Sequence, residues 1–400
     1  MKINRIKKQI EGDQVKLSSK IETNEGNFDL WFSVNKKYED YTVHENLDSF
    51  LLALFPHAMY LGEDIYLEAP VSEKLYFNLS KHLVKIYSII FPSWKEIRIF
   101  GDNLKNSSLY PNENNVVTGF SGGIDSFCLL DEYYFNSREL ENHQITHLIY
   151  NNVGAHGDNA PVFFQKRFQK LQQFADEADL PFIKIDSNLP DILDTDFRYT
   201  ALPRNAAAVL ILQKLFSKYL YASGYSYYDF LHNHIFSHGY LDHIDFHLLS
   251  TESMECILSG SEYPRVEKTR RVAKLELSYR YLYVCTNTKL REAENCSVCF
   301  KCARTLLTLE ILGLLHLYEN LFDIQKFKRI RRGYIESIIY EQDPYGKEIL
   351  DIASQYNYPI SSVSKLLGSS YVYPIMNNLR KKIPYNVRHH IKNISGLSRI

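Results

Sequence analysis

Residues 116–130 read VVTGFSGGIDSFCLL, and this stretch decides the fold. A β-branched pair runs into two adjacent glycines, after which the chain becomes apolar again with a helical spacing. Glycine adopts positive φ without steric cost, and serine and aspartate are preferred where helices begin. The stretch therefore predicts a buried strand, a tight loop and a helix whose first backbone N–H groups point into the loop, an arrangement that binds phosphate.

The elements that follow this loop predict a parallel sheet. Strands and helices are expected to alternate, at 115–120 (strand), from 125 (helix), 145–152 (strand), 160–178 (helix), 180–187 (strand) and 204–221 (helix). This order is typical of α/β folds in which helices cover both faces of a parallel sheet. Ligands bind at the carboxyl ends of such strands, so we expect residues 121–126 to lie at the ligand-binding end.

The length of 400 residues predicts more than one domain. Residues 1–112 are expected to form an N-terminal α+β domain of unknown role, with strands at 28–34 and 64–69 and helices at 48–59 and 72–90. Residues 113–315 are expected to form the α/β domain, and residues 316–400 a basic helical C-terminal region. Residues 321–400 carry 13 Lys and Arg against 6 Asp and Glu, which leaves a charge of +7.

The whole composition is that of a folded soluble protein, with 45% hydrophobic and 23% charged residues. The net charge of −1 argues against a dedicated nucleic-acid binder. The basic C-terminal region fits either an anionic protein or nucleic-acid partner or a solvated helical surface. No stretch reaches 18 apolar residues, and no signal peptide is recognisable, so we expect no membrane contact and a cytoplasmic location.

Four of the six cysteines crowd into residues 285–302, as Cys285, Cys296, Cys299 and Cys302. Four thiolates match a tetrahedral zinc site, and since the protein would supply all four ligands, we expect Zn²⁺ to be structural there. Lys301 and Arg304 would offset the surplus negative charge. An iron–sulfur cluster is the alternative, because thiolates alone do not decide the metal. Cys128 and Cys256 are expected to be ordinary core residues.

The sequence SGGIDS between a strand and a helix resembles the PP-loop of the ATP pyrophosphatase superfamily. The resemblance implies an HUP-like, doubly wound sheet and a loop that holds the pyrophosphate end of ATP. By resemblance, Ser121, Gly122, Gly123 and Ser126 would bind phosphate oxygens, and Asp125 would face Mg²⁺. Pyrophosphate would then leave, and an acceptor oxygen would take AMP.

The loop and the late cysteine cluster together resemble the 7-cyano-7-deazaguanine synthase (QueC-like) family, including its longer members in antiviral defence. The resemblance implies an ATP-dependent, AMP-forming ligase that adenylates a small-molecule carboxylate, of the deazaguanine type or another acid, for attack by ammonia or an amine. Arg204 and Asn205 resemble an Arg-Asn motif of the family, and Lys268 lies in a stretch like its lysine-containing helix. Asp125, Arg204 and Lys268 are thus the catalytic candidates, although surface positions would also suit Arg204 and Lys268.

The chain also departs from this family. The family's Tyr-Pro-Asp-Cys-Arg stretch is absent, and the corresponding region carries five histidines: His232, His234, His238, His243 and His247. These histidines fit a second metal site, acid–base groups or a polar loop. Two other functions stay open: a tRNA sulfur transferase with an iron–sulfur cluster, and a non-catalytic nucleotide-binding regulatory or defence subunit.

Overall fold

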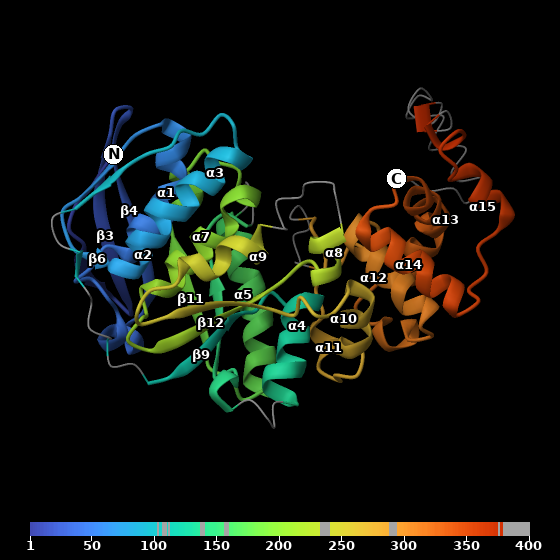
Figure 1. The fold of residues 1–400 in the computed structure, drawn as a ribbon. Helices are drawn as coiled ribbons and strands as arrows, with labels where there is room; N and C mark the ends of the chain where they lie inside the picture. Colours follow the sequence, from blue (N-terminus) through green and yellow to red (C-terminus); the bar gives the residue numbers. More distant parts are fainter. Residues whose placement is uncertain are drawn as a thin grey trace. The chain divides into compact units, whose positions relative to one another are not determined.

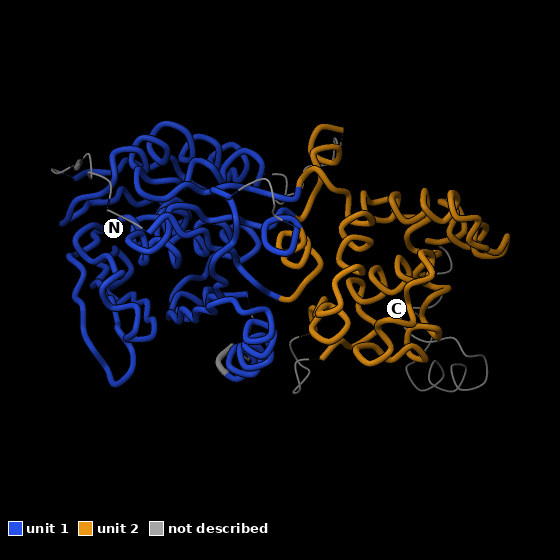
Figure 2. Tube along the Cα trace, turned by 90° about the horizontal axis from the view of Figure 1, so that it is seen from below, with its two compact units in different colours: residues 1–121, 132–223, 234–260 blue, residues 122–131, 224–233, 261–400 orange. Residues whose placement is uncertain are grey.

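The computed structural model describes residues 1–101, 104–105, 110, 113–136, 141–155, 160–232, 241–287, 294–374 and 377–378. The chain divides into two compact units (Figure 2). Unit 1 comprises residues 1–121, 132–223 and 234–260, and unit 2 comprises residues 122–131, 224–233 and 261–400. Each unit is therefore assembled from segments that are separated in the sequence.

Unit 1 is built on a mixed sheet that has eleven strands in the described residues, in the order β13-β12-β9-β10-β11-β4-β3-β1-β5-β7, with β2 on β3. The strands are β1 Lys2–Ile3, β2 Lys7–Glu11, β3 Gln14–Thr23, β4 Gly26–Asn35, β5 Ile65–Leu67, β7 Ile99–Phe100, β9 Asn115–Gly119, β10 His147–Asn151, β11 Phe182–Ser187, β12 Phe216–Ala222 and β13 Glu255–Ser259. The five strands from β13 to β11 pair in parallel. The predicted α/β fold with a mostly parallel sheet is confirmed. Strands β6 Val71–Ser72 and β8 Leu104–Lys105 form a separate parallel pair.

Helices cover both faces of this sheet (Figure 1). The helices of unit 1 are α1 Asp48–Leu61, α2 Glu73–Asn78, α3 Val84–Ile90, α5 Ala160–Glu177, α6 Leu189–Ile192, α7 Phe197–Leu210 and α9 Asp242–Asp245. π-Helical turns lie at Leu79–Leu83 and Asp131–Phe135, and 3₁₀ turns lie at Lys36–Tyr41, Glu141–His143 and Phe246–Leu249. On β10, Ile149 joins the core that includes α1 and α7, whereas the ring of Tyr150 stacks on Phe164 of α5. Consecutive strand residues point to opposite faces, so α5 covers the face that α1 and α7 do not.

Two expectations differ from the structure. The helix predicted at 204–221 is confirmed only as far as Leu210, where α7 ends, and is wrong beyond it, because β12 follows between β9 and β13. Residues 216–222 are rich in aromatic side chains that suit a central strand, and this position in the sheet determines their conformation. Residues 1–112 were expected to form a domain of their own, but β4 pairs antiparallel with β11 and extends the same sheet.

Unit 2 is helical in its described residues. Its helices are α4 Ile124–Leu130, α8 Tyr227–His232, α10 Arg265–Val272, α11 Ser278–Tyr281, α12 Phe300–Ile311, α13 Ile324–Glu341, α14 Pro344–Gln355 and α15 Ser362–Leu367, with a 3₁₀ turn at Leu315–Tyr318. Helix α10 packs against α4, α12 and α14. The helical character predicted for the region from 316 is confirmed in its described part. Within the described residues, no helix has the length and apolarity needed to cross a membrane.

Candidate functional site

The predicted phosphate loop adopts the conformation that its glycines permit. Gly122 has φ of 71°, in the region that favours glycine, and its carbonyl accepts a hydrogen bond from Tyr283 N at 2.7 Å. Gly123 precedes the first residue of α4, and Ser126 Oγ donates to Gly123 O at 3.1 Å. In unit 1, Ser121 O accepts from Arg167 Nη2 at 2.9 Å. The strand, loop and helix predicted here are therefore present.

Asp125, in the first turn of α4, is held by two cations of α10. Arg265 Nη2 lies 2.8 Å from Asp125 Oδ2, and Lys268 Nζ lies 3.3 Å from Asp125 Oδ1. Burial raises the pKa of Asp125, but the positive charges of Arg265 and Lys268 outweigh it and hold that pKa below its usual value. Lys268 is only 1% exposed, which excludes the alternative of an exposed helix lysine. The structure thus brings together two residues, Asp125 and Lys268, that the sequence singled out 143 positions apart.

A third cation, Arg304 of α12, belongs to the same cluster. The guanidinium of Arg304 lies 3.9 Å from the ring centre of Tyr345, and that of Arg265 lies 5.4 Å from the same ring centre. Tyr345 is fixed in turn because its hydroxyl donates to Gly224 O at 3.0 Å. Arg304 is only 7% exposed, and its buried Nε has no hydrogen-bond partner in the described part of the chain. Such a buried donor is costly unless a ligand accepts its hydrogen.

The charge balance of this cluster is positive. Glu348 of α14 accepts a hydrogen bond from Val266 N at 2.9 Å, and burial raises its pKa to about 7. At neutral pH, Arg265, Lys268 and Arg304 therefore face one fully ionised carboxylate and one that is partly protonated. These groups leave a net charge between +1 and +2, which an anionic ligand would offset.

Sequence reasoning missed part of this cluster. Arg265 lies three positions before Lys268, so both side chains lie on one face of α10, and that spacing could have revealed it. Arg304 was expected only to offset the charge of the cysteines. Nothing in the sequence around Tyr345 pointed to the loop at 121–126, since only the tertiary fold brings Tyr345 to Arg265.

Arg204 and Asn205 lie in unit 1, in the interior of α7 and not at its start. Arg204 is 2% exposed, and its Nη2 donates to Thr195 O at 2.7 Å and to Thr195 Oγ1 at 2.9 Å. Asn205 Nδ2 donates to Ala201 O at 2.8 Å, and Asn205 Oδ1 accepts from Asn151 at 3.2 Å. The alternative of a surface charge is wrong for Arg204. The predicted contact of both residues with the nucleotide stays a prediction.

The four clustered cysteines form a candidate metal centre in unit 2. The sulfurs of Cys285, Cys296, Cys299 and Cys302 all lie within 4.8 Å of one another, and two pairs are 3.9 Å apart. A zinc ion with Zn–S bonds of about 2.3 Å holds tetrahedral sulfurs about 3.8 Å apart, so the set fits a closed four-sulfur site. Backbone N–H groups support the sulfurs, as Cys299 N donates to Cys296 Sγ at 3.2 Å. The group could therefore bind a metal such as zinc.

Within the part of the chain that the structure describes, the remaining candidates give no second metal centre. His234 and His238 lie outside the described residues. Among the described residues, the cysteine cluster is the only group of three or more His, Cys, Asp or Glu side chains placed to share an ion. Cys128 and Cys256 are each 1% exposed, as expected for core residues.

Comparisons of the chain with protein-family models, with curated proteins and with solved structures found no match.

Proposed function

We propose that the protein is an ATP-dependent ligase that forms AMP and pyrophosphate while it adenylates a small carboxylate for attack by ammonia or an amine. The observation that carries the proposal is the buried cationic cluster beside the loop of residues 122–126. Two of its cations, Arg265 and Lys268, pair with Asp125, and the third, Arg304, keeps a buried N–H without an acceptor in the described residues. A phosphate group would offset the positive charge of this cluster, and the sequence of the loop resembles the PP-loop.

The residues of the cluster would act on the leaving group. Lys268, Arg265 and Arg304 would neutralise the negative charge that develops on pyrophosphate as the α-phosphate is transferred. Asp125 would keep Arg265 and Lys268 in place before the nucleotide arrives, so that little rearrangement is needed at the moment of reaction. Gly122 would let the backbone approach the phosphates, since it has no Cβ.

Magnesium at Asp125 suits the structure poorly. Mg²⁺ needs oxygen ligands that offset its charge, whereas both oxygens of Asp125 are paired with cations and Arg304 adds a further charge nearby. The described residues around Asp125 therefore do not fit a magnesium site, and the steps above do not depend on one.

The cysteine cluster would have a structural role in this proposal. Cys299 directly precedes α12, and Cys302 lies in its first turn, two positions before Arg304. A metal held by Cys285, Cys296, Cys299 and Cys302 would fix the start of α12 and so the position of Arg304. Four protein ligands leave no open coordination position, and the metal would supply no reactive group.

The decisive experiment is calorimetric titration of ATP into the Arg304→Gln variant. Glutamine keeps much of the length of arginine but removes the charge, and hydrogen bonds to charged groups contribute about 1.5–3 kcal/mol, so ATP affinity should fall by about tenfold to hundredfold. The control is Arg329→Gln, which removes an exposed arginine from α13 of the same unit. Equal affinities of the two variants would contradict the proposed phosphate site.

The chemistry requires a second measurement on the unaltered protein. Incubation with ATP, ammonium and a panel of carboxylic acids, including deazaguanine acids, should release AMP and pyrophosphate. ADP as the product would contradict adenylation. ATP binding without turnover on any acid would favour the non-catalytic subunit instead, and stoichiometric iron with sulfide would favour the sulfur transferase.

A further inference from the structure

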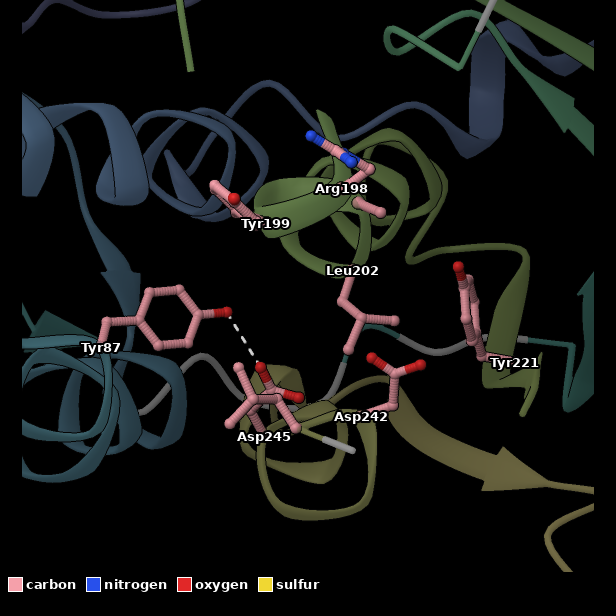
Figure 3. A pocket seen from close by; sticks show the side chains of 9 residues that line it. Tyr87, Arg198, Tyr199, Leu202, Tyr221, Asp242 and Asp245 are labelled. Carbon is pink, nitrogen blue, oxygen red and sulfur yellow. Dashed lines mark hydrogen bonds between the residues drawn. The ribbon is translucent and has the colours of Figure 1, made fainter. Parts of the chain in front are cut away.

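A small polar cavity lies within unit 1, between the helices on one face of the sheet. Its volume is about 120 Å³, and α3, α7, α9 and β12 contribute its walls. The polar lining residues are Tyr87, Arg198, Tyr199, Tyr221, Asp242 and Asp245. Figure 3 shows the carboxylates of Asp242 and Asp245 pointing from α9 toward α7, with Tyr87 on one side and Tyr221 on the other.

The cavity contains two carboxylates without a neutralising cation. Asp242 and Asp245 lie one helical turn apart on α9, and neither forms an ion pair with a described residue. The one cation of the lining, Arg198, is paired with Asp196 at 2.6 Å, and its side chain is 78% exposed. Burial raises the pKa of both carboxyl groups, that of Asp245 to about 7, so the negative charge that appears as Asp245 ionises above pH 7 is not balanced by the residues that line the cavity.

Asp245 also has an unused acceptor. It is 2% exposed, its Oδ2 accepts a hydrogen bond from Tyr87 at 3.0 Å, and its Oδ1 is buried without a hydrogen-bond partner in the described part of the chain. A buried carboxylate oxygen that has lost water and gained no donor carries a free-energy cost. A ligand that donates a hydrogen bond to Oδ1 would remove that cost.

We propose that this cavity binds a small primary ammonium cation, either ammonium itself or a short alkylamine. Its N–H groups would donate to Asp245 Oδ1 and Asp242 in charge-assisted hydrogen bonds, and the rings of Tyr87, Tyr199 and Tyr221 would line the site as aromatic residues do in other cation sites. Mg²⁺ or Ca²⁺ suits the cavity less well, because each takes six or more oxygen ligands. The cavity lies wholly within unit 1, so the inference stands whether or not the ATP chemistry of unit 2 is correct.

The test is calorimetric titration of methylammonium into the full chain at pH 8, in phosphate buffer. Tetramethylammonium is the matched probe, because it carries the same charge but has no N–H donor. We expect methylammonium to bind about tenfold or more tightly than tetramethylammonium. Equal binding of the two, absence of methylammonium binding, or a preference for Mg²⁺ or Ca²⁺ over both would overturn the proposal.

Two variants assign the binding to Asp245. Asp245→Asn should weaken methylammonium binding by about tenfold or more, because it removes the charge and one acceptor. Asp191→Asn, at an exposed position of α6 in the same unit, should leave binding unchanged. Circular dichroism would establish that both variants are folded. Unaltered binding in folded Asp245→Asn would refute the site.

Discussion

Replacing Asp245 by asparagine should stabilise unit 1 at pH 8, even though it removes a buried hydrogen-bonding group. Burial raises the pKa of Asp245 from 3.8 to about 7, and its hydrogen bond from Tyr87 only partly opposes this shift. The other titratable or charged groups that line the cavity with Asp245 are Arg198, Tyr199, Tyr221 and Asp242. Asparagine has nearly the same shape as aspartate and can still accept the hydrogen of the Tyr87 hydroxyl.

The direction and the size follow from proton linkage. Between pH 3.8 and 7 the folded chain holds a proton on Asp245 that the unfolded chain has lost, so ionisation costs the folded state increasingly as the pH rises. The full shift from 3.8 to about 7 corresponds to about 4 kcal/mol at most, and this cost is fully present above pH 7. Asparagine has no such cost. The variant should therefore gain about 1–4 kcal/mol at pH 8 and nothing comparable at pH 3.5.

Urea unfolding followed by tryptophan fluorescence measures this effect in the correct unit, since both tryptophans of the chain, Trp31 and Trp94, belong to unit 1. Tris should be avoided, because it is a primary amine and could itself occupy the cavity. Asp191→Asn serves as the control for the loss of a charge. A gain in Asp245→Asn that is the same at pH 3.5 and pH 8, or a loss at pH 8, would show that burial does not raise the pKa of Asp245.

Two further predictions concern unit 2. Cys299→Ser should lose bound zinc, measured by mass spectrometry under native conditions, and should become insoluble or partly unfolded, because a structural metal contributes directly to folding. Cys256→Ala, which removes a thiol outside the cluster, should keep one zinc per chain. Zinc retained in Cys299→Ser would contradict the four-sulfur site. Gly122→Val should abolish ATP binding in calorimetry, since its φ of 71° and the expected approach of phosphate both exclude a branched Cβ. The matched control is Gly313→Val, which imposes similar strain at φ of 73° where a Cβ would meet nothing within 4 Å. Similar ATP affinities in the two glycine variants would argue against the phosphate loop.

The local elements of the central sheet could be predicted from sequence because each has its own periodicity. The strands β9, β10 and β11 and the helix α5 lie where alternation, apolar runs and helical spacing indicated them. The cysteine cluster was equally predictable, since three of its four members lie within seven residues. In each case the pattern spans a short segment, in which residues that are close in the sequence are also close in space.

What could not be predicted depends on contacts between distant segments. Residues 216–222 became a strand because β9 and β13 flank them. The pairing of β4 with β11 joins residues about 150 positions apart, and no local pattern encodes such a register. The cationic cluster combines α4, α10, α12 and α14 in the same way. The sequence indicated Asp125 and Lys268 as members of this site. Only the structure showed that Arg265 and Arg304 add two further positive charges to it.

The interleaving of the two units has a consequence for how the protein folds on the ribosome. Because β12 follows segment 122–131 of unit 2 and β13 follows segment 224–233 as well, the sheet of unit 1 cannot be completed before residue 259 has emerged. Helix α4 must in turn wait for α10, its neighbour in unit 2. This chain therefore cannot follow the usual order of folding during synthesis, in which the first domain folds completely before the second begins to fold. A ribosome that stalled after residue 260 would leave Asp125 of α4 and Asp131 at its end without Lys268 and Arg271, their ion-pair partners on α10.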